Sequence, residues 1–281
     1  MINNPDNSAA NAFPFHTLWR QRSMMWQFAR RYVHVRHKGS YLGIFWQVLT
    51  PLLMLALYTF VFGVLLHGHF GVVADETSAD YALGIFLGFT LYGLVADCMN
   101  AAPNVVFDNS NLVKKVLFPV EILPASMALS MFYSFIVSMG LFVVGDVFLG
   151  PAPTWHALWF PVILLPLFLL AAGLAWLIGA LGVYFRDVQN FMQFLTTSLF
   201  YVSGIFFSAS SANAGTKARV ALEVLRWNPI FLAIDLSRDV TLWGRAPDFG
   251  EMAYLYGVCV AVFAAGYAVF MRLKAGFADV M

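Results

Sequence analysis

The sequence has few charged residues for its length. Only 11% of the 281 residues are Asp, Glu, Lys or Arg, whereas 60% are hydrophobic and 17% are aromatic. Soluble domains usually carry about 25% charged residues, so a water-soluble body of this size would have too little polar surface. Lipid is therefore the expected solvent for much of the chain. The net charge of +1 also argues against a nucleic-acid partner, because such partners require a strong basic patch.

Motifs for several common chemistries are absent from the sequence. It contains no GxxxxGK loop followed by Ser or Thr for ATP phosphates, no HExxH, no paired-cysteine metal spacing and no GxSxG nucleophile elbow. Cys98 and Cys259 lie inside apolar runs, so we interpret them as small core residues rather than a disulfide. The six histidines fall near predicted membrane boundaries and are interpreted as interfacial groups. We expect no catalytic residue, metal site or cofactor in this chain.

Six apolar segments are long enough to cross a membrane. About 20 helical residues span ~30 Å of hydrocarbon, and a helix pairs its own backbone groups there. The sequence therefore predicts an all-α integral membrane protein with a transmembrane domain over 39–275. The predicted spans are 41–66, 81–106, 122–145, 157–184, 189–207 and 252–271.

The basic residues fall mostly in segments that alternate spans leave on one side. Six precede the first span, Lys114 and Lys115 follow the second, and Arg186 follows the fourth. Lys and Arg are enriched in cytoplasmic loops, so we expect both termini and the 107–119 loop in the cytoplasm. The 208–250 segment is an exception, with five basic residues on the outer side. Since it is too polar to span, we expect short re-entrant or surface helices there. One of them is predicted to start after Asn228-Pro229, because proline is well tolerated in a first helical turn.

The N-terminal region predicts a helix that lies in the membrane interface. Residues 1–13 are polar and are expected to be a disordered tail, and 14–38 are predicted to be helical. Apolar pairs recur seven residues apart, from Leu18 and Trp19 to Tyr32 and Val33, and would share one face. Arginines on the helix would reach lipid headgroups. A packed soluble helix is the alternative interpretation.

Asp97 is the only acid well within a predicted span. A charge inside a bilayer is energetically unfavourable and is usually functional. A proton path normally uses several buried groups, however, and one acid gives it little support. We therefore expect Asp97 to cap a helix or to pair within the bundle.

Aromatic residues are abundant, and some recur on one helix face. Flat rings cover the apolar faces of sugars, so such a set suits a path for a long amphipathic polymer. Spacings of three, four and seven residues place the members of each pair on a common face. Packing or lipid contact remains the simpler interpretation for any single ring. The candidate channel residues are Tyr58, Phe62, Phe89, Tyr92, Phe194 and Tyr201.

Three stretches of the chain resemble a known family. They are VRHKGSYLGIFWQVLTPLLMLALYTFVFGVLL at 35–66, NSNLVKKVLFPVEILP at 109–124 and WNPIFLAIDLSRDVTLWGRAPD at 227–248. In order and spacing the chain resembles the membrane subunit of ABC-2-type polysaccharide exporters, which move lipid-linked O-antigen, capsular polysaccharide or teichoic acid. Val120 departs from this pattern, since a basic residue is common there, and the first outer loop is short.

The resemblance implies a transport subunit rather than an enzyme. It implies that two copies of this chain surround a central path in the bacterial cytoplasmic membrane. Two separate ATP-binding-cassette subunits would bind ATP and Mg, and a lipid-linked polysaccharide would be the substrate. Residues that would contact the ATPase are Asn111, Lys114, Lys115, Arg186 and Asp187.

The resemblance and the charge pattern also suggest two further sets of residues. Basic residues near the inner leaflet would attract a lipid phosphate. Short helices between spans 5 and 6 would form an outer gate. The candidates for the phosphate are Arg30, Arg31, Arg36 and Lys38, and those for the gate are Trp227, Asn228, Pro229 and Arg238.

Three other functions remain open at this point. An ABC-2 permease for a small hydrophobic drug or lipid would share the fold and the ATPase. An ion-coupled secondary transporter predicts several intramembrane acids and internal repeats, which the sequence lacks. A membrane enzyme such as a glycan acyltransferase predicts a cluster of His or acidic residues near one membrane face.

Overall fold

The computed structural model describes residues 18–36, 39–65, 68–73, 76–113, 118–151, 154–209 and 216–280. These residues contain helices and no β-strand, which confirms the predicted all-α class. The α-helices are α2 (Arg22–Arg36), α3 (Trp46–Tyr58), α4 (Ser78–Val105), α5 (Ser110–Val113), α6 (Ile122–Leu149), α7 (Phe160–Tyr184), α8 (Val188–Val202), α9 (Thr216–Leu225), α10 (Pro229–Thr241), α11 (Phe249–Leu273) and α12 (Phe277–Val280). A π-helix, Thr59–Leu65, continues α3.

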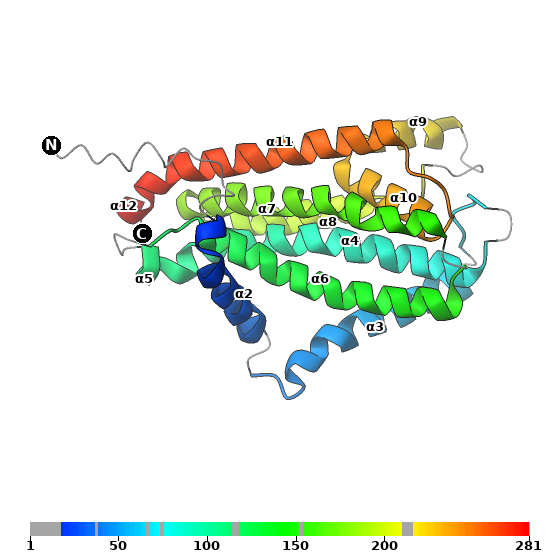
Figure 1. Cartoon of the computed structure of the whole chain (residues 1–281), viewed down its shortest axis with the longest axis horizontal. Helices are drawn as coiled ribbons and strands as arrows, with labels where there is room; N and C mark the ends of the chain where they lie inside the picture. Colours follow the sequence, from blue (N-terminus) through cyan, green and yellow to red (C-terminus); the bar gives the residue numbers. More distant parts are fainter. Residues whose placement is uncertain are drawn as a thin grey trace.

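The long helices form a bundle with α4 and α7 at its centre. In Figure 1, α4, α6, α7 and α11 run along the long axis, while α2 and α3 diverge on one side. The first and last described helices, α2 and α12, lie toward the same end of the bundle. Helix α7 packs closely on α11. A Cβ atom at Gly173 would lie only 2.6 Å from the Cα atom of Phe263. Only glycine allows this approach of the two backbones.

Five helical stretches among the described residues are long and apolar enough to span a membrane. They are Trp46–Leu65, Ser78–Val105, Ile122–Leu149, Trp155–Tyr184 and Phe249–Gly276. Each corresponds to one of the predicted spans, the first four and the sixth. The chain is therefore a multi-pass membrane protein. Some helix limits agree with the prediction to within one residue, and the others differ by up to five residues.

The prediction of a fifth span at 189–207 is wrong in its length. Helix α8 has 15 residues and is about 22 Å long, which is less than the ~30 Å of hydrocarbon. The helix ends before Gly204, whose φ is +74°. A Cβ at Gly204 would lie 2.6 Å from the ring of Phe231 in α10. The turn that ends α8 is therefore fixed by glycine and by packing against α10.

Local sequence signals explain where three of the helices begin. Thr77 and Asp80 form a capping box at the start of α4. The Asn228 side chain caps α10, and Pro229 occupies its first turn, as the sequence predicted. The Asp248 side chain accepts two backbone N–H groups at the start of α11.

Helix α2 lies across one end of the bundle and packs on α6. Leu18, Met25 and Tyr32 contact the core, whereas Trp19 and Trp26 are 72% and 61% exposed. The predicted apolar pairs are therefore split between two faces of the helix. One face binds the bundle and the other is free to contact lipid, as expected of an interfacial helix. Residues 1–17 and 37–38 of the predicted tail and helix lie outside the described residues.

Candidate functional site

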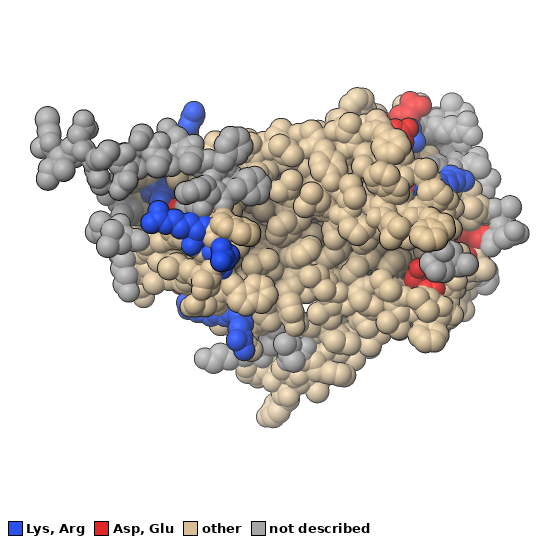
Figure 2. Space-filling model, viewed as in Figure 1, with Lys and Arg blue, Asp and Glu red and all other residues tan. Residues whose placement is uncertain are grey.

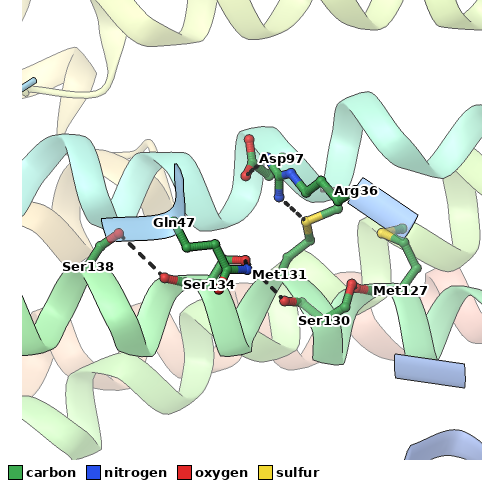
Figure 3. Close-up of polar contacts among 8 residues, drawn as sticks. All are labelled: Arg36, Gln47, Asp97, Met127, Ser130, Met131, Ser134 and Ser138. Carbon is green, nitrogen blue, oxygen red and sulfur yellow. Dashed lines mark hydrogen bonds and ion pairs between the residues drawn. The ribbon is translucent and has the colours of Figure 1, made fainter. Parts of the chain in front are cut away.

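Asp97 forms an ion pair with Arg36. The Nη2 atom of Arg36 donates to Oδ2 of Asp97 at 3.0 Å. Its Nη1 atom lies 3.1 Å from the sulfur of Met131 on α6. The expected pairing of Asp97 is thus confirmed. Its partner belongs to helix α2, 61 residues earlier in the chain, so the pair ties α2 to α4 (Figure 3).

A cavity of about 270 Å³ opens beside this ion pair, between α3, α4 and α6. Polar side chains line it together with apolar ones. The Nε2 atom of Gln47 donates to the hydroxyl of Ser134 at 3.3 Å. Ser134 and Ser138, one helical turn apart on α6, also line the cavity, as Figure 3 shows. The cavity therefore offers a charged pair and several hydrogen-bonding groups. Its other polar lining residues are Thr50 and Thr90.

A second cavity of about 260 Å³ lies between α2 and α6. Arg30 and His34 line it from α2, and Ser130 and Tyr133 line it from α6. Of the four basic residues proposed to meet a lipid phosphate, Arg30 and Arg36 therefore line cavities. Arg31 is exposed on the same helix, and Lys38 lies outside the described residues.

The structure brings five of the six candidate channel aromatics into one cluster. Phe200 is at its centre, with ring centroids 5.4–6.3 Å from Phe89, Tyr92, Tyr201 and Phe206. Tyr58 contacts both Phe62 and Phe89. The cluster, called the aromatic cluster below, comprises Tyr58, Phe62, Phe89, Tyr92, Phe200, Tyr201 and Phe206.

The aromatic cluster joins α3 and its π-helix to α4 and to the end of α8. Phe194, the sixth candidate, is 69% exposed on α8. Phe200 and Phe206 were not among the candidates. Phe200 lies eight residues after Met192, a buried residue on the inner face of α8, and this helical spacing was the available signal. Phe206 lies beyond the end of α8, where helical spacing no longer applies.

Helix α2 contacts the 107–119 loop on both sides of its undescribed part. The amide nitrogen of Asn109 donates to the Tyr32 hydroxyl at 3.1 Å and to the Val105 carbonyl at 2.8 Å. The rings of Phe28 and Phe118 meet edge to face at 5.8 Å. Burial, opposed by the bond from Asn109, raises the pKa of Tyr32 to about 12. The hydroxyl therefore stays neutral near pH 7 and accepts the amide N–H.

Three of the residues predicted to contact an ATPase lie at this same end of the bundle and are exposed, namely Asn111, Arg186 and Asp187. Lys114 and Lys115 fall outside the described residues. Near the same end, Nζ of Lys274 lies 2.6 Å from Oε2 of the buried Glu121, and this bond fixes the end of α11 against the start of α6. Neither of these two residues was singled out from the sequence.

Arg238 is fully buried at the opposite end of the bundle. It donates hydrogen bonds of 2.6–3.3 Å to the backbone carbonyls of Gly84, Gly204, Ile205 and Phe207. Its guanidinium also lies 4.2 Å from the centre of the Phe70 ring. Arg238 therefore joins α4, α10 and the turn after α8, and anchors α10 in the bundle.

The other three gate candidates lie at the start of α10, where they pack against α11. Trp227 is 68% exposed, and its carbonyl accepts a 2.8 Å bond from the Tyr254 hydroxyl. The two rings meet edge to face at 5.2 Å. Asn228 and Pro229 start α10, and the Asn228 amide also reaches the Val202 carbonyl at 3.3 Å. The turn therefore links the end of α8 to the first turns of α11.

Comparison with known proteins shows a family match and similar proteins along most of the chain. The ABC-2 type transporter family matches residues 24–242, more than three quarters of the chain. The O-antigen export system permease protein RfbA of Myxococcus xanthus is 24% identical over 262 residues, covering 93% of this chain and 96% of that protein. A protein of the same name from Klebsiella pneumoniae is 24% identical over 251 residues, covering 88% of this chain and 90% of that protein. The chain therefore belongs to the ABC-2 type transporter family, as a membrane permease subunit similar to those of O-antigen exporters.

Proposed function

We propose that this chain is the permease subunit of an ATP-driven exporter of a lipid-linked polysaccharide, O-antigen or capsular polysaccharide. The observation that carries the proposal is the end-to-end similarity to permeases named for O-antigen export. Similarity over nearly the whole of both chains favours a shared substrate class more than a match to one domain would. The export would cross the bacterial cytoplasmic membrane.

The distribution of charge supports an orientation with both termini in the cytoplasm. In Figure 2, most of the basic surface lies at the end of the bundle where α2 and α12 are found. Acidic residues are most visible at the other end, and the surface between is almost free of charge. Lys and Arg are retained on the cytoplasmic side of membrane proteins. The exposed Asn111, Arg186 and Asp187 would then face the ATP-binding-cassette subunits, together with Lys114 and Lys115.

The exposure of α3 supports a second copy of the chain as partner. Only 6% of the residues in the most apolar window of Trp46–Leu65 are buried. In a symmetric pair, this face and the exposed face of α8 would border a central path. The aromatic cluster lies between these two helices, with Tyr201 64% exposed. Its rings would then contact the apolar faces of sugars as the glycan passes.

The proposed cycle begins at the cytoplasmic end of the bundle. ATP and Mg bind to the partner subunits, whose closure moves the 107–119 loop. Asn109 and Phe118 pass this movement to α2 through Tyr32 and Phe28. The path between the two copies widens, and the glycan advances outward along it. Arg30 and Arg36 would hold the lipid phosphate at the inner leaflet.

An ABC-2 permease for a small hydrophobic drug or lipid is the alternative. It would share the coupling loop and the partner ATPase but would need no long path lined with rings. Disruption of the gene in the native host separates the two. We expect loss of long-chain polysaccharide from the cell surface and accumulation of its lipid-linked precursor inside. Unchanged surface polysaccharide with altered resistance to hydrophobic drugs would contradict the proposal and favour the alternative.

A transport-deficient control makes this experiment specific. The disrupted strain should regain surface polysaccharide with the intact gene but not with Lys114→Glu and Lys115→Glu together. The same charge reversal should lower recovery of a co-purifying ATPase in mild detergent. Arg272→Glu, which changes an exposed cytoplasmic-end residue on α11, should restore export and retain the ATPase.

A further inference from the structure

The position of the Arg36–Asp97 pair along α4 would place it within the depth of the membrane. Helix α4 has 28 residues and is about 42 Å long, while the hydrocarbon layer is ~30 Å thick. Asp97 lies eight residues before the end of α4 at Val105, or about 12 Å from it. With α4 centred, the pair lies about 6 Å inside the hydrocarbon. A charged pair at such a depth is energetically unfavourable, and such residues usually belong to a functional site.

The pair is open to the cavity beside it. The Arg36 side chain is 46% exposed and the Asp97 side chain 43%. A guanidinium has five N–H donors, and the partners of Arg36 among the described residues are one carboxylate oxygen and a thioether sulfur. The sulfur of Met131 is a weak acceptor. A phosphate is a better ligand for Arg36, because it accepts two parallel hydrogen bonds from the planar fork.

The cavity walls suit the headgroup of a phosphorylated lipid. Its volume of about 270 Å³ is too small for a polymer and matches a compact headgroup. Gln47, Ser134 and Ser138 offer hydrogen-bonding groups to hydroxyls next to the phosphate. Apolar Met54 and Phe89 line the same cavity and suit a hydrocarbon tail. Helix α3, which forms one wall, is largely exposed along its length.

Helix α2 connects this cavity to the 107–119 loop. Arg36 is its last residue and holds α4 and α6. Tyr32, about one turn earlier, bonds to Asn109, and Phe28, one turn before that, meets Phe118. A change in the partner of Arg36 is therefore communicated to the loop through two turns of a single helix.

We propose that the cavity binds a lipid-borne phosphate ester and that the phosphate replaces Asp97 on Arg36. Asp97 then acts as a positioning residue that holds Arg36 and α2 in the empty state. When the phosphate takes Arg36, the end of α2 is released from α4, and the loaded state differs from the empty one at the 107–119 loop. The inference rests on the proposed function, since it assigns to that transporter a device that reports substrate loading.

The direction in which Asp97→Asn changes the affinity for a phosphate ester separates this role from a purely structural one. If Asp97 only supports the fold, Asp97→Asn leaves Arg36 without its partner and weakens or preserves ligand binding. If Asp97 competes with the phosphate, Asp97→Asn removes the competitor and tightens binding. We expect the affinity for a phosphate ester to rise by about three- to tenfold, in line with the loss of one partly exposed ion pair.

The test measures equilibrium binding of radiolabelled farnesyl phosphate to the full-length protein in phosphatidylcholine nanodiscs. Asp97→Asn should bind several-fold more tightly than the wild type, and Arg36→Gln at least tenfold more weakly. Farnesol should not compete. Equal competition by inorganic phosphate would overturn the lipid-borne part of the proposal. Binding by Asp97→Asn that is equal to or weaker than that of the wild type would overturn the exchange.

Matched controls keep the result interpretable. Glu223→Gln and Arg272→Gln change one acid and one base that lie outside the cavity and should leave binding unchanged. The double variant Arg36→Gln with Asp97→Asn removes both charges, so no charge is left unpaired in the membrane. It should fold, as judged by an unchanged thermal midpoint, and should lose binding. If the double variant bound farnesyl phosphate normally, Arg36 would not be the phosphate ligand.

A labelling experiment tests the release of α2 separately. Ala29 is 4% exposed on α2, and both native cysteines are buried. A thiol at Ala29→Cys should react with maleimide faster when farnesyl phosphate is added, and fastest in the Asp97→Asn background. Labelling that ignores both changes would overturn the link to the loop. Surface polysaccharide that survives gene disruption would contradict the proposed function without changing these binding results.

Discussion

Helices α4 and α3 are both apolar enough to span a membrane, yet their surroundings are opposite. In the most apolar 18 residues of α4, 83% of the residues are buried within the chain, against 6% in the most apolar 18 residues of Trp46–Leu65. The hydropathy of the two windows is similar, at 1.7 and 2.2. Apolar composition alone therefore does not tell a helix that packs in its own chain from one that contacts lipid or a partner.

The difference indicates two separate tasks. Helix α4 holds the fold together through α6, α7 and the buried Arg238. Helix α3 with its π-helix contacts α4 and α6, in part through the aromatic cluster, and leaves Leu53, Leu57 and Phe60 at least half exposed. Changes on α4 should therefore affect folding, whereas changes on α3 should affect assembly and transport.

The largest expected effect comes from removing the anchor between α4 and α10. Arg238→Met would leave several buried carbonyls without a donor, each unpaired group being worth about 1–3 kcal/mol. We expect a loss of more than about 5 kcal/mol of folding free energy and little protein in the membrane. Fluorescence size-exclusion chromatography and thermal unfolding check this.

Arg245→Met is the matched control at the same end of the molecule. Arg245 is exposed and donates one 3.0 Å hydrogen bond to the Val72 carbonyl. Its substitution should change the thermal midpoint by only a few degrees. Equal stability of the two variants would show that Arg238 does not anchor the fold.

The same substitution on the two helices sharpens the comparison further. Phe86 on α4 is fully buried, and Phe60 in the π-helix that extends α3 is 55% exposed. Phe86→Ala should cost about 3–5 kcal/mol because it opens a cavity, whereas Phe60→Ala should cost under about 0.5 kcal/mol in the monomer. Thermal unfolding in detergent measures both. A ranking in the reverse order would contradict the burial described for α3.

A smaller effect is expected where α2 meets the loop. Tyr32→Phe removes the acceptor of the Asn109 amide and should cost about 1 kcal/mol. It should also lower recovery of the co-purifying ATPase, because the loop loses its bond to α2. Tyr254→Phe, which removes a 2.8 Å bond at the opposite end, should have a similar thermal effect and leave ATPase recovery intact. Unchanged recovery with Tyr32→Phe would argue against α2 as part of the coupling unit.

Much of this architecture could be predicted from the sequence, because spans and helix starts depend on local composition. Five of the six apolar runs became long helices, and the Asn228-Pro229 start of α10 followed from cap chemistry. The need of Asp97 for a partner followed from the energetics of charge in lipid.

The rest depended on contacts between distant segments. The partner of Asp97 is 61 residues away in the sequence, and nothing local identifies Arg36 among the several arginines of that region. The early end of α8 depends on Gly204 meeting Phe231 and on carbonyls that Arg238 binds. Phe206 joins the aromatic cluster only because of that turn. Such tertiary contacts have no periodic signal in the sequence.

Crosslinking across α3 is the most direct test of the claim that a second copy and the glycan path cover this helix. A single thiol at Phe60→Cys would be oxidised in native membranes, with Val147→Cys, 66% exposed on α6, as the control. The account predicts a disulfide-linked dimer from Phe60→Cys and a loss of surface polysaccharide that reductant restores. A monomer from Phe60→Cys with a dimer from Val147→Cys would contradict it, because α3 would then face lipid alone.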